Sequence, residues 1–134
     1  MDDKYEIFCL VNDKRNKARI LLNEEQERYK IKFEMETCSV LVEAENYFYA
    51  LIELRKRLET EKIKLLCKGC SRYVYPSPMI LGMGDAIEAY ELTLGKHATV
   101  KNLVNIFSSC ELDEYATIEE QLAYYEEWLK SKKE

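Results

Sequence analysis

Apolar and polar residues alternate with the two-residue period of β-strands over most of the first 42 residues. Residues 4–11 carry apolar side chains on both faces, and a polar turn at 12–17 leads into a short strand at 18–22. In residues 28–34, Tyr29, Ile31 and Phe33 alternate with charged residues, which is typical of a half-buried strand. Residues 39–42 are predicted to form a fourth strand. The sequence therefore predicts an antiparallel meander at its N-terminal end.

The spacing of apolar residues lengthens after residue 44. Residues 45–59 place apolar side chains three and four positions apart among helix-forming residues, so they predict a first helix. Short strands are expected at 63–67, 72–75 and 88–94, and Pro76 and Pro78 force the chain to turn between the last two. Residues 79–84 fit a loop or a single helical turn, and residues 103–107 fit either a helix or a strand.

A second principal helix is predicted at 117–131. Thr117 followed by Glu120 is the sequence signature of a capping box at a helix N-terminus. The face expected to pack against the core consists of Ile118, Gln121, Leu122, Tyr125, Trp128 and Leu129. Strands, helix, strands and helix in this order predict an α+β fold in a single domain, with a mainly antiparallel sheet and two principal helices at about 45–59 and 117–131.

Composition narrows the class of protein. The chain has 134 residues, 47% of them hydrophobic, and no apolar run approaches the ~18 residues that span a bilayer. Its start, MDDKYEIFCLV, lacks the basic and apolar blocks of a secretory signal, so we expect a cytoplasmic protein with reduced cysteines and no membrane contact. The net charge of −5 argues against binding of nucleic acid through its phosphates and favours a basic protein partner.

The motif CKGC at residues 67–70 is the first candidate for chemistry, because two thiolates at this spacing can grip one metal ion. A structural zinc needs four ligands, and the sequence holds no second pair at ligand spacing. The remaining donors are Cys9, Cys38, His97 and Cys110. Cys67 and Cys70 are therefore half of a zinc site, a redox pair, or two unconnected turn cysteines. We favour the last interpretation and expect neither a metal nor another cofactor.

The sequence contains no complete catalytic motif. His97 is the only histidine, and a histidine-dependent hydrolase would have to bring a nucleophile to it in space. Gly82 and Gly84 match the start of a dinucleotide-binding loop, but Ile87 stands where its third glycine is needed. We therefore expect no catalytic residues and interpret these glycines as turn residues.

The strongest charge signal lies toward the C-terminal end. Residues 102–129 contain seven acids and neither lysine nor arginine, a local charge of −7. Together with the aromatic residues among them, these acids fit a surface that docks on a cationic protein. They also fit an ordinary solvated helix face whose aromatic side chains point to the core. The residues that we select for partner binding are Glu111, Asp113, Glu114, Glu119, Glu120, Tyr124 and Glu127.

Residues 74–107 carry a series of short motifs: Val-Tyr-Pro-Ser with a methionine soon after it, then Met-Gly, Ala-Tyr-x-Leu, Gly-Lys and Leu-Val-x-Ile-Phe. In these motifs, which cover roughly a quarter of the chain, it resembles small bacterial toxin-immunity proteins, including those of contact-dependent growth inhibition. Pro78 departs from the glycine of that pattern. The resemblance implies a compact cytosolic domain that binds a toxin domain and blocks it without catalysis. We therefore expect a non-enzymatic toxin inhibitor, with a basic nuclease as the favoured target and a zinc- or thiol-dependent module at Cys67 and Cys70 as the alternative.

Overall fold

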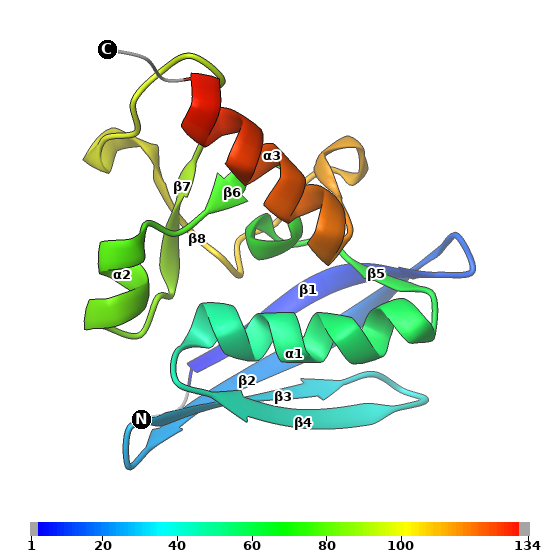
Figure 1. Cartoon of the computed structure of the whole chain (residues 1–134). Helices are drawn as coiled ribbons and strands as arrows, with labels where there is room; N and C mark the ends of the chain where they lie inside the picture. The colour runs from blue at the N-terminus through cyan, green and yellow to red at the C-terminus, as the bar shows by residue number, and fades with distance from the viewer. Residues whose placement is uncertain (1–2, 132–134) are drawn as a thin grey trace.

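The alternating N-terminal segment folds into a curled antiparallel sheet (Figure 1). In the computed structural model, which describes residues 3–131, its five strands lie in the order β4-β3-β2-β1-β5. Their bounds are β1 Asp3–Val11, β2 Lys14–Glu25, β3 Arg28–Glu34, β4 Ser39–Ala44 and β5 Ile63–Leu65. The predicted meander is confirmed, and β3 has the predicted bounds. Met1 and Asp2, which open the stretch used to predict localisation, lie outside the described residues.

β2 begins at Lys14 rather than at residue 18, so the turn predicted at 12–17 is too long. The connection from β1 consists of Asn12 and Asp13, whose φ angles of 52° and 65° are those of a two-residue hairpin turn. Residues 14–17 are exposed and pair with the end of β1, because polar side chains on the solvent side do not oppose strand pairing. Gln26 and Glu27, also with positive φ, join β2 to β3 in the same way.

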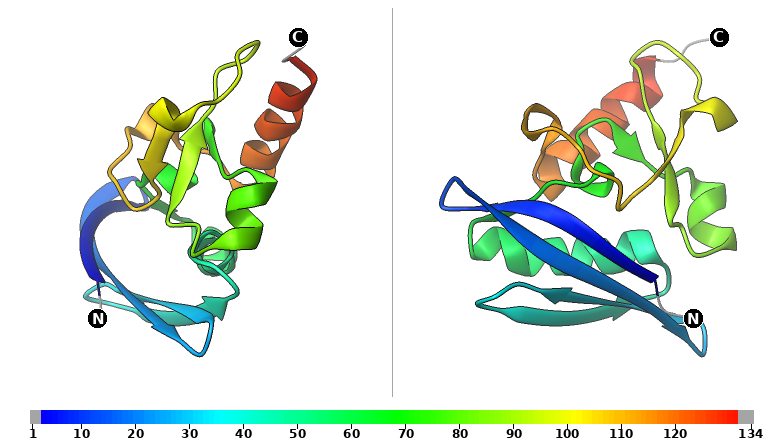
Figure 2. Two further views of the ribbon diagram at one scale, coloured as in Figure 1. Left: turned by 90° about the vertical axis from the view of Figure 1, so that its left-hand side faces the viewer. Right: turned by 180° about the vertical axis from the view of Figure 1, so that it is seen from behind.

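The helix α1, Tyr47–Thr60, lies on the concave side of this sheet (Figure 2). Asn46 caps its N-terminus by accepting a hydrogen bond from Tyr49 N at 2.8 Å. Phe48, Leu51 and Leu54 are fully buried on the face toward the strands. The helix predicted at 45–59 is thus confirmed, because its apolar spacing matches the face that the sheet covers.

The irregular middle of the chain builds a second, three-stranded antiparallel sheet in the order β6-β7-β8. Its strands are β6 Val74–Tyr75, β7 Glu88–Glu91 and β8 Leu103–Asn105. Between β6 and β7 lies the helix α2, Pro78–Met83, which Ser77 caps by accepting from Ile80 N at 3.1 Å. Single 3-10 turns occur at η1 Lys68–Cys70, η2 Val100–Asn102 and η3 Leu112–Glu114, and the last helix is α3 Ile118–Ser131.

Three strands are shorter than predicted. The strand expected at 63–67 ends at Leu65, the one at 72–75 begins at Val74, and the one at 88–94 ends at Glu91. The neighbouring backbone makes other contacts instead: Arg72 N donates to Glu114 O at 2.7 Å, and a turn follows β7. Two segments had alternative predictions. Residues 79–84, predicted as a loop or a helical turn, fall mostly in α2, and residues 103–105, predicted as helix or strand, form a strand.

Both sheets contribute to one buried core. It joins Ile20 and Phe33 of the large sheet, Leu51 of α1, and Val74 and Ala89 of the second sheet. The predicted α+β class with antiparallel pairing is confirmed, although the strands form two sheets and α2 adds a short third helix. Within residues 3–131, no helix is long and apolar enough to cross a membrane.

Candidate functional site

The helix α3 is held at its N-terminus by side chains. Thr117 Oγ1 accepts from Glu120 N at 3.1 Å, and Glu120 Oε1 accepts from Thr117 N at 2.9 Å. The capping box predicted from the sequence is therefore confirmed. Glu59 at the end of α1 adds a third bond, because its Oε2 accepts from Ile118 N at 2.9 Å. These contacts fix the start of α3 relative to α1.

Removal of either half of the capping box tests this anchoring. Thr117→Ala or Glu120→Ala is expected to lower the free energy of unfolding by about 1 kcal/mol, because each leaves one backbone N–H of α3 without its acceptor. Urea denaturation of the two variants and of Glu119→Ala measures the effect. Glu119 is an exposed neighbour outside the capping box, so its loss should change stability by less than about 0.5 kcal/mol. Equal losses in all three variants would contradict the assignment.

The inner face of α3 is aromatic and packs on the second sheet. Gln121 and Trp128 are buried, whereas Tyr124 and Tyr125 are half-buried. Tyr124 OH donates to Leu92 O at 3.3 Å, and the Tyr125 ring stacks on Tyr75 with centroids 4.2 Å apart. Trp128 Nε1 donates to Lys96 O at 2.9 Å. These aromatic side chains therefore hold the helix in place.

The predicted packing face of α3 needs one correction. Leu122 and Leu129, which we expected in the core, are exposed to 41% and 44%. The buried face is centred on Gln121 and Trp128. At 3.6 residues per turn, both leucines lie about a quarter turn away from that centre. They form one edge of the outer surface instead.

The outer face of α3 gathers carboxylates. Glu119, Glu120, Glu126 and Glu127 are all exposed, and Leu122 and Leu129 border them. We call this set of six residues the acidic face. It includes three of the residues selected from the sequence, and Glu126, Leu122 and Leu129 are additions. The sequence signal that could have identified these additions is the spacing 119-122-126-129, which places four residues on one side of a helix.

The other selected residues occupy different environments. Glu111 and Asp113 are exposed at η3. Glu114 is half-buried, and its Oε1 lies 3.3 Å from Lys68 Nζ. Tyr124 points inward, as described above, so much of its surface is already used. Glu114 and Tyr124 thus have structural contacts of their own, while Glu111 and Asp113 extend the negative charge ahead of α3.

The cysteine pair is buried and in mutual contact. Cys67 and Cys70 are free thiols, both fully buried, and their Sγ atoms lie 3.8 Å apart, so the two turn cysteines are neighbours without a disulfide. The hydrogen bond to Cys70 and burial raise the pKa of Cys67. Burial also acts to raise the pKa of Cys70, but the hydrogen bond from Cys67 and the nearby Arg55 charge outweigh it and lower that pKa.

The other possible metal ligands do not complete a site around this pair. Burial raises the pKa of Cys110 to about 12, and His97 is exposed on the loop after β7. Among residues 3–131, no group of three or more histidine, cysteine, aspartate or glutamate side chains is arranged to hold a metal ion. The zinc alternative therefore lacks the further ligands that a structural zinc requires.

A buried Arg55–Gln121 network joins the cysteine turn to both long helices. Arg55 in α1 is only 2% exposed, and its guanidinium donates to Gly69 O, Gln121 Oε1 and Ala116 O at 3.1, 2.6 and 2.9 Å. Gln121 Nε2 donates to three carbonyl oxygens, those of Gly69, Ser71 and Val74, each at 2.9 Å. Arg55 lies within the helix predicted at 45–59, but its role in this network was not predicted.

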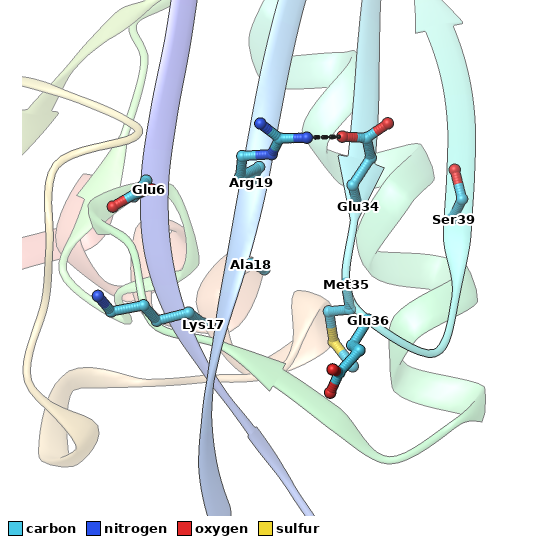
Figure 3. A pocket seen from close by; sticks show the side chains of 8 residues that line it. All are labelled: Glu6, Lys17, Ala18, Arg19, Glu34, Met35, Glu36 and Ser39. Carbon is cyan, nitrogen blue, oxygen red and sulfur yellow. Dashed lines mark hydrogen bonds and ion pairs between the residues drawn. The ribbon is translucent and has the colours of Figure 1, made fainter.

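A surface hollow of about 450 Å³ lies on the large sheet where β3 ends (Figure 3). Its charged residues carry both signs, and Arg19 Nη2 lies 2.9 Å from Glu34 Oε1. The hydrogen bond from Lys32, with a further contribution from Arg19, holds the pKa of Glu34 below its usual range. A general base works best with a pKa near the working pH, so this carboxylate is poorly suited to proton transfer.

The acidic face carries four charges of the same sign, and none of the ion pairs described for residues 3–131 joins one of its carboxylates to a lysine or arginine. It is displayed on a helix that is fixed at both its start and its inner side. Comparison of the chain with models of known protein families and with curated proteins gives no match.

Proposed function

We propose that this chain is a non-enzymatic inhibitor of the toxin-immunity type, which binds a basic partner protein and covers its active surface. A toxin nuclease is the favoured target, and the cytoplasm is the proposed site of action. The observation that supports this function best is the acidic face of α3, with four exposed carboxylates and two exposed leucines on one rigid element. No metal or other cofactor is needed for such a role.

Charge on this face would act mainly on the rate of encounter. Residues 102–129 carry −7, more negative than the −5 of the whole chain, so the negative potential is concentrated at the C-terminal end. A concentrated charge attracts an oppositely charged protein over several ångströms and raises the association rate. Leu122 and Leu129 would then lose water on contact, and burial of apolar area lengthens the life of a complex.

Rigidity supports the same interpretation. A binding face that is already ordered loses little conformational entropy when its partner arrives. The capping box, Glu59 and the Arg55–Gln121 network hold α3 before any partner is present. An inhibitor that blocks its target by stoichiometric binding needs a preformed surface and no reactive group. The burial of the thiols and the ion pair of Glu34 are consistent with the lack of such a group.

Protection of a cell is the direct test. The proposal predicts a toxin domain encoded immediately upstream, and that domain is expressed in a bacterial host with and without this chain while survival is counted. We expect the chain to restore growth at equimolar expression and to co-purify with the toxin domain. Failure of the chain to protect the host, although both proteins are present, would refute the proposed function.

Charge reversal tests the acidic face. Replacement of Glu119, Glu126 and Glu127 by lysine should slow association with the toxin domain by about 10- to 100-fold at low salt and flatten its salt dependence, because the steering potential is lost. Surface plasmon resonance at several salt concentrations measures both effects. The matched control replaces Glu27, Glu36 and Glu45, three exposed acids of the large-sheet end of the molecule, and has the same net charge. Equal slowing in both triple variants would show that total charge, not this face, controls binding.

A further inference from the structure

Two neighbouring hollows, one beside α3 and one beside α2, form what we call the aromatic trough. The first, about 400 Å³, lies between α3 and the segment after β6, and is lined by Tyr75, Pro76, Pro78, Tyr90, Tyr125 and Trp128. The second, about 370 Å³, lies beside α2 and is lined by residues that include Met79, Ile87 and Leu103. Tyr90 of β7 belongs to both, so the two hollows are neighbours.

The trough offers flat apolar walls together with hydrogen-bond donors. Tyr75 stacks on Tyr125 with rings inclined by 16°, and Tyr125 stacks on Trp128 at 21°. Within residues 3–131, the hydroxyls of Tyr75, Tyr90 and Tyr125 make no hydrogen bond to a protein group. An extended peptide presents main-chain carbonyl oxygens at regular intervals, and aromatic-lined grooves bind extended proline-rich peptides in several recognition domains.

The rims of the trough are apolar and acidic. Met79 in the second hollow is 70% exposed and Leu129 in the first is 44% exposed, so the walls of both hollows include exposed apolar surface. Apolar surface that is grouped in this way marks sites of protein contact. Asp85 and Glu88, both exposed, line the second hollow. The charge complementary to these rims is that of lysine or arginine.

We infer that the trough receives an extended basic segment of the partner, with one apolar side chain in each hollow and a lysine or arginine beside Glu88. The inference rests on the proposed function, because the same partner would contact the acidic face of α3. The trough thus adds sequence selectivity to the charge attraction, since apolar side chains of the right spacing must accompany the basic residue.

The experiment uses the whole chain and a random library of twelve-residue peptides displayed on phage. Selected peptides are synthesised and titrated into the chain while the fluorescence of Trp128, the only tryptophan, is recorded. We expect enrichment of peptides with lysine or arginine and two spaced apolar residues, and a saturable change in fluorescence. Absence of enrichment, or enrichment of acidic peptides, would overturn the inference.

Exposed residues give variants that keep the fold. Glu88→Lys and Leu129→Glu should each weaken binding of the selected peptides at least about tenfold, whereas Glu53→Lys on the exposed side of α1 should leave it unchanged. Urea denaturation checks that all three variants remain folded. If the selected peptides bind all three variants equally, the binding site lies elsewhere. If the chain forms dimers and Leu129→Glu abolishes them, the occupant of the trough is a second copy of the chain.

The two proposals fail in different ways. If the chain protects a host from the toxin while Glu88→Lys and Leu129→Glu protect equally well and no peptide is selected, the trough has no role and the proposed function stands. If the chain does not protect but basic peptides bind in the trough, the toxin-immunity function is wrong, and a peptide-binding site remains.

Discussion

Arg55→Ala is expected to lower the free energy of unfolding by about 4 kcal/mol. The guanidinium is 2% exposed and donates to two carbonyl oxygens and to Gln121. Its removal leaves a cavity in the core and leaves the acceptors at Gly69 and Ala116 with fewer donors. Loss of one partner from a buried charged network typically costs about 3–5 kcal/mol. Urea denaturation followed by the fluorescence of Trp128 measures the change.

Arg57→Ala is the matched control for this prediction. Arg57 lies in the same helix, two residues further on, but its side chain is exposed. Its removal should change stability by less than about 0.5 kcal/mol. A double-mutant cycle with Gln121→Ala should show coupling of at least about 1 kcal/mol, because the two side chains contact directly at 2.6 Å. A loss of stability in Arg55→Ala no larger than in Arg57→Ala would mean that the network contributes little.

Arg55→Ala should also weaken the anchoring of the proposed binding face. Gln121 belongs to α3 and bonds both to Arg55 and to the turn at Gly69. Without the guanidinium, α3 loses one of its polar links to α1, although the bond from Ile118 N to Glu59 and the aromatic contacts of Tyr125 and Trp128 remain. Weaker anchoring raises the entropy that binding must remove, so the complex with a partner should dissociate faster.

Gly69→Ala is expected to destabilise the protein by about 3 kcal/mol, because the turn that contains it is enclosed on both sides. A Cβ at this position would overlap Leu51 and would meet Ile106 Cβ and Ile106 O, each at 3.1 Å. The turn cannot move aside easily, because Gly69 N donates to Ile106 O at 2.7 Å and Gly69 O accepts from Arg55 and Gln121. Urea denaturation again gives the magnitude.

Gly82→Ala is a control for which the expected change in stability has the opposite sign. Gly82 lies in α2, and a Cβ built there meets no atom within 4 Å. Alanine in place of a helical glycine should raise stability by up to about 1 kcal/mol, since it reduces the conformational freedom of the unfolded chain. Similar destabilisation by both substitutions would indicate a general intolerance of alanine rather than the tight packing of Gly69.

Short-range sequence patterns predicted the structure correctly where the interactions that form a helix or strand lie within that one element. The alternation of Tyr29, Ile31 and Phe33 places a strand because one face meets the core wherever the strand lies. Thr117 and Glu120 place a helix start because both partners of the capping box are three residues apart. The α+β class follows from the order of such elements.

Patterns were less reliable where a partner distant in the sequence makes the contact. Leu122 and Leu129 look like core residues from their spacing, but the direction from which the second sheet approaches α3 leaves them exposed. Gln121 was placed on the packing face and is 1% exposed, but the carbonyl oxygens of three other residues that surround its amide could not be predicted. No spacing within the helix encodes where those carbonyl groups lie.

The candidate site also has features that the sequence predicts and features that only the folded chain shows. Local periodicity and charge were sufficient to place an acidic helix at the C-terminal end, because the helical repeat and the sign of a side chain are properties of a short stretch. The aromatic trough, the contact between Cys67 and Cys70, and the burial of Arg55 appear only after the chain has folded. Each is made by residues that other elements bring together, and the free energy that holds them there comes from packing of the whole core rather than from any one segment.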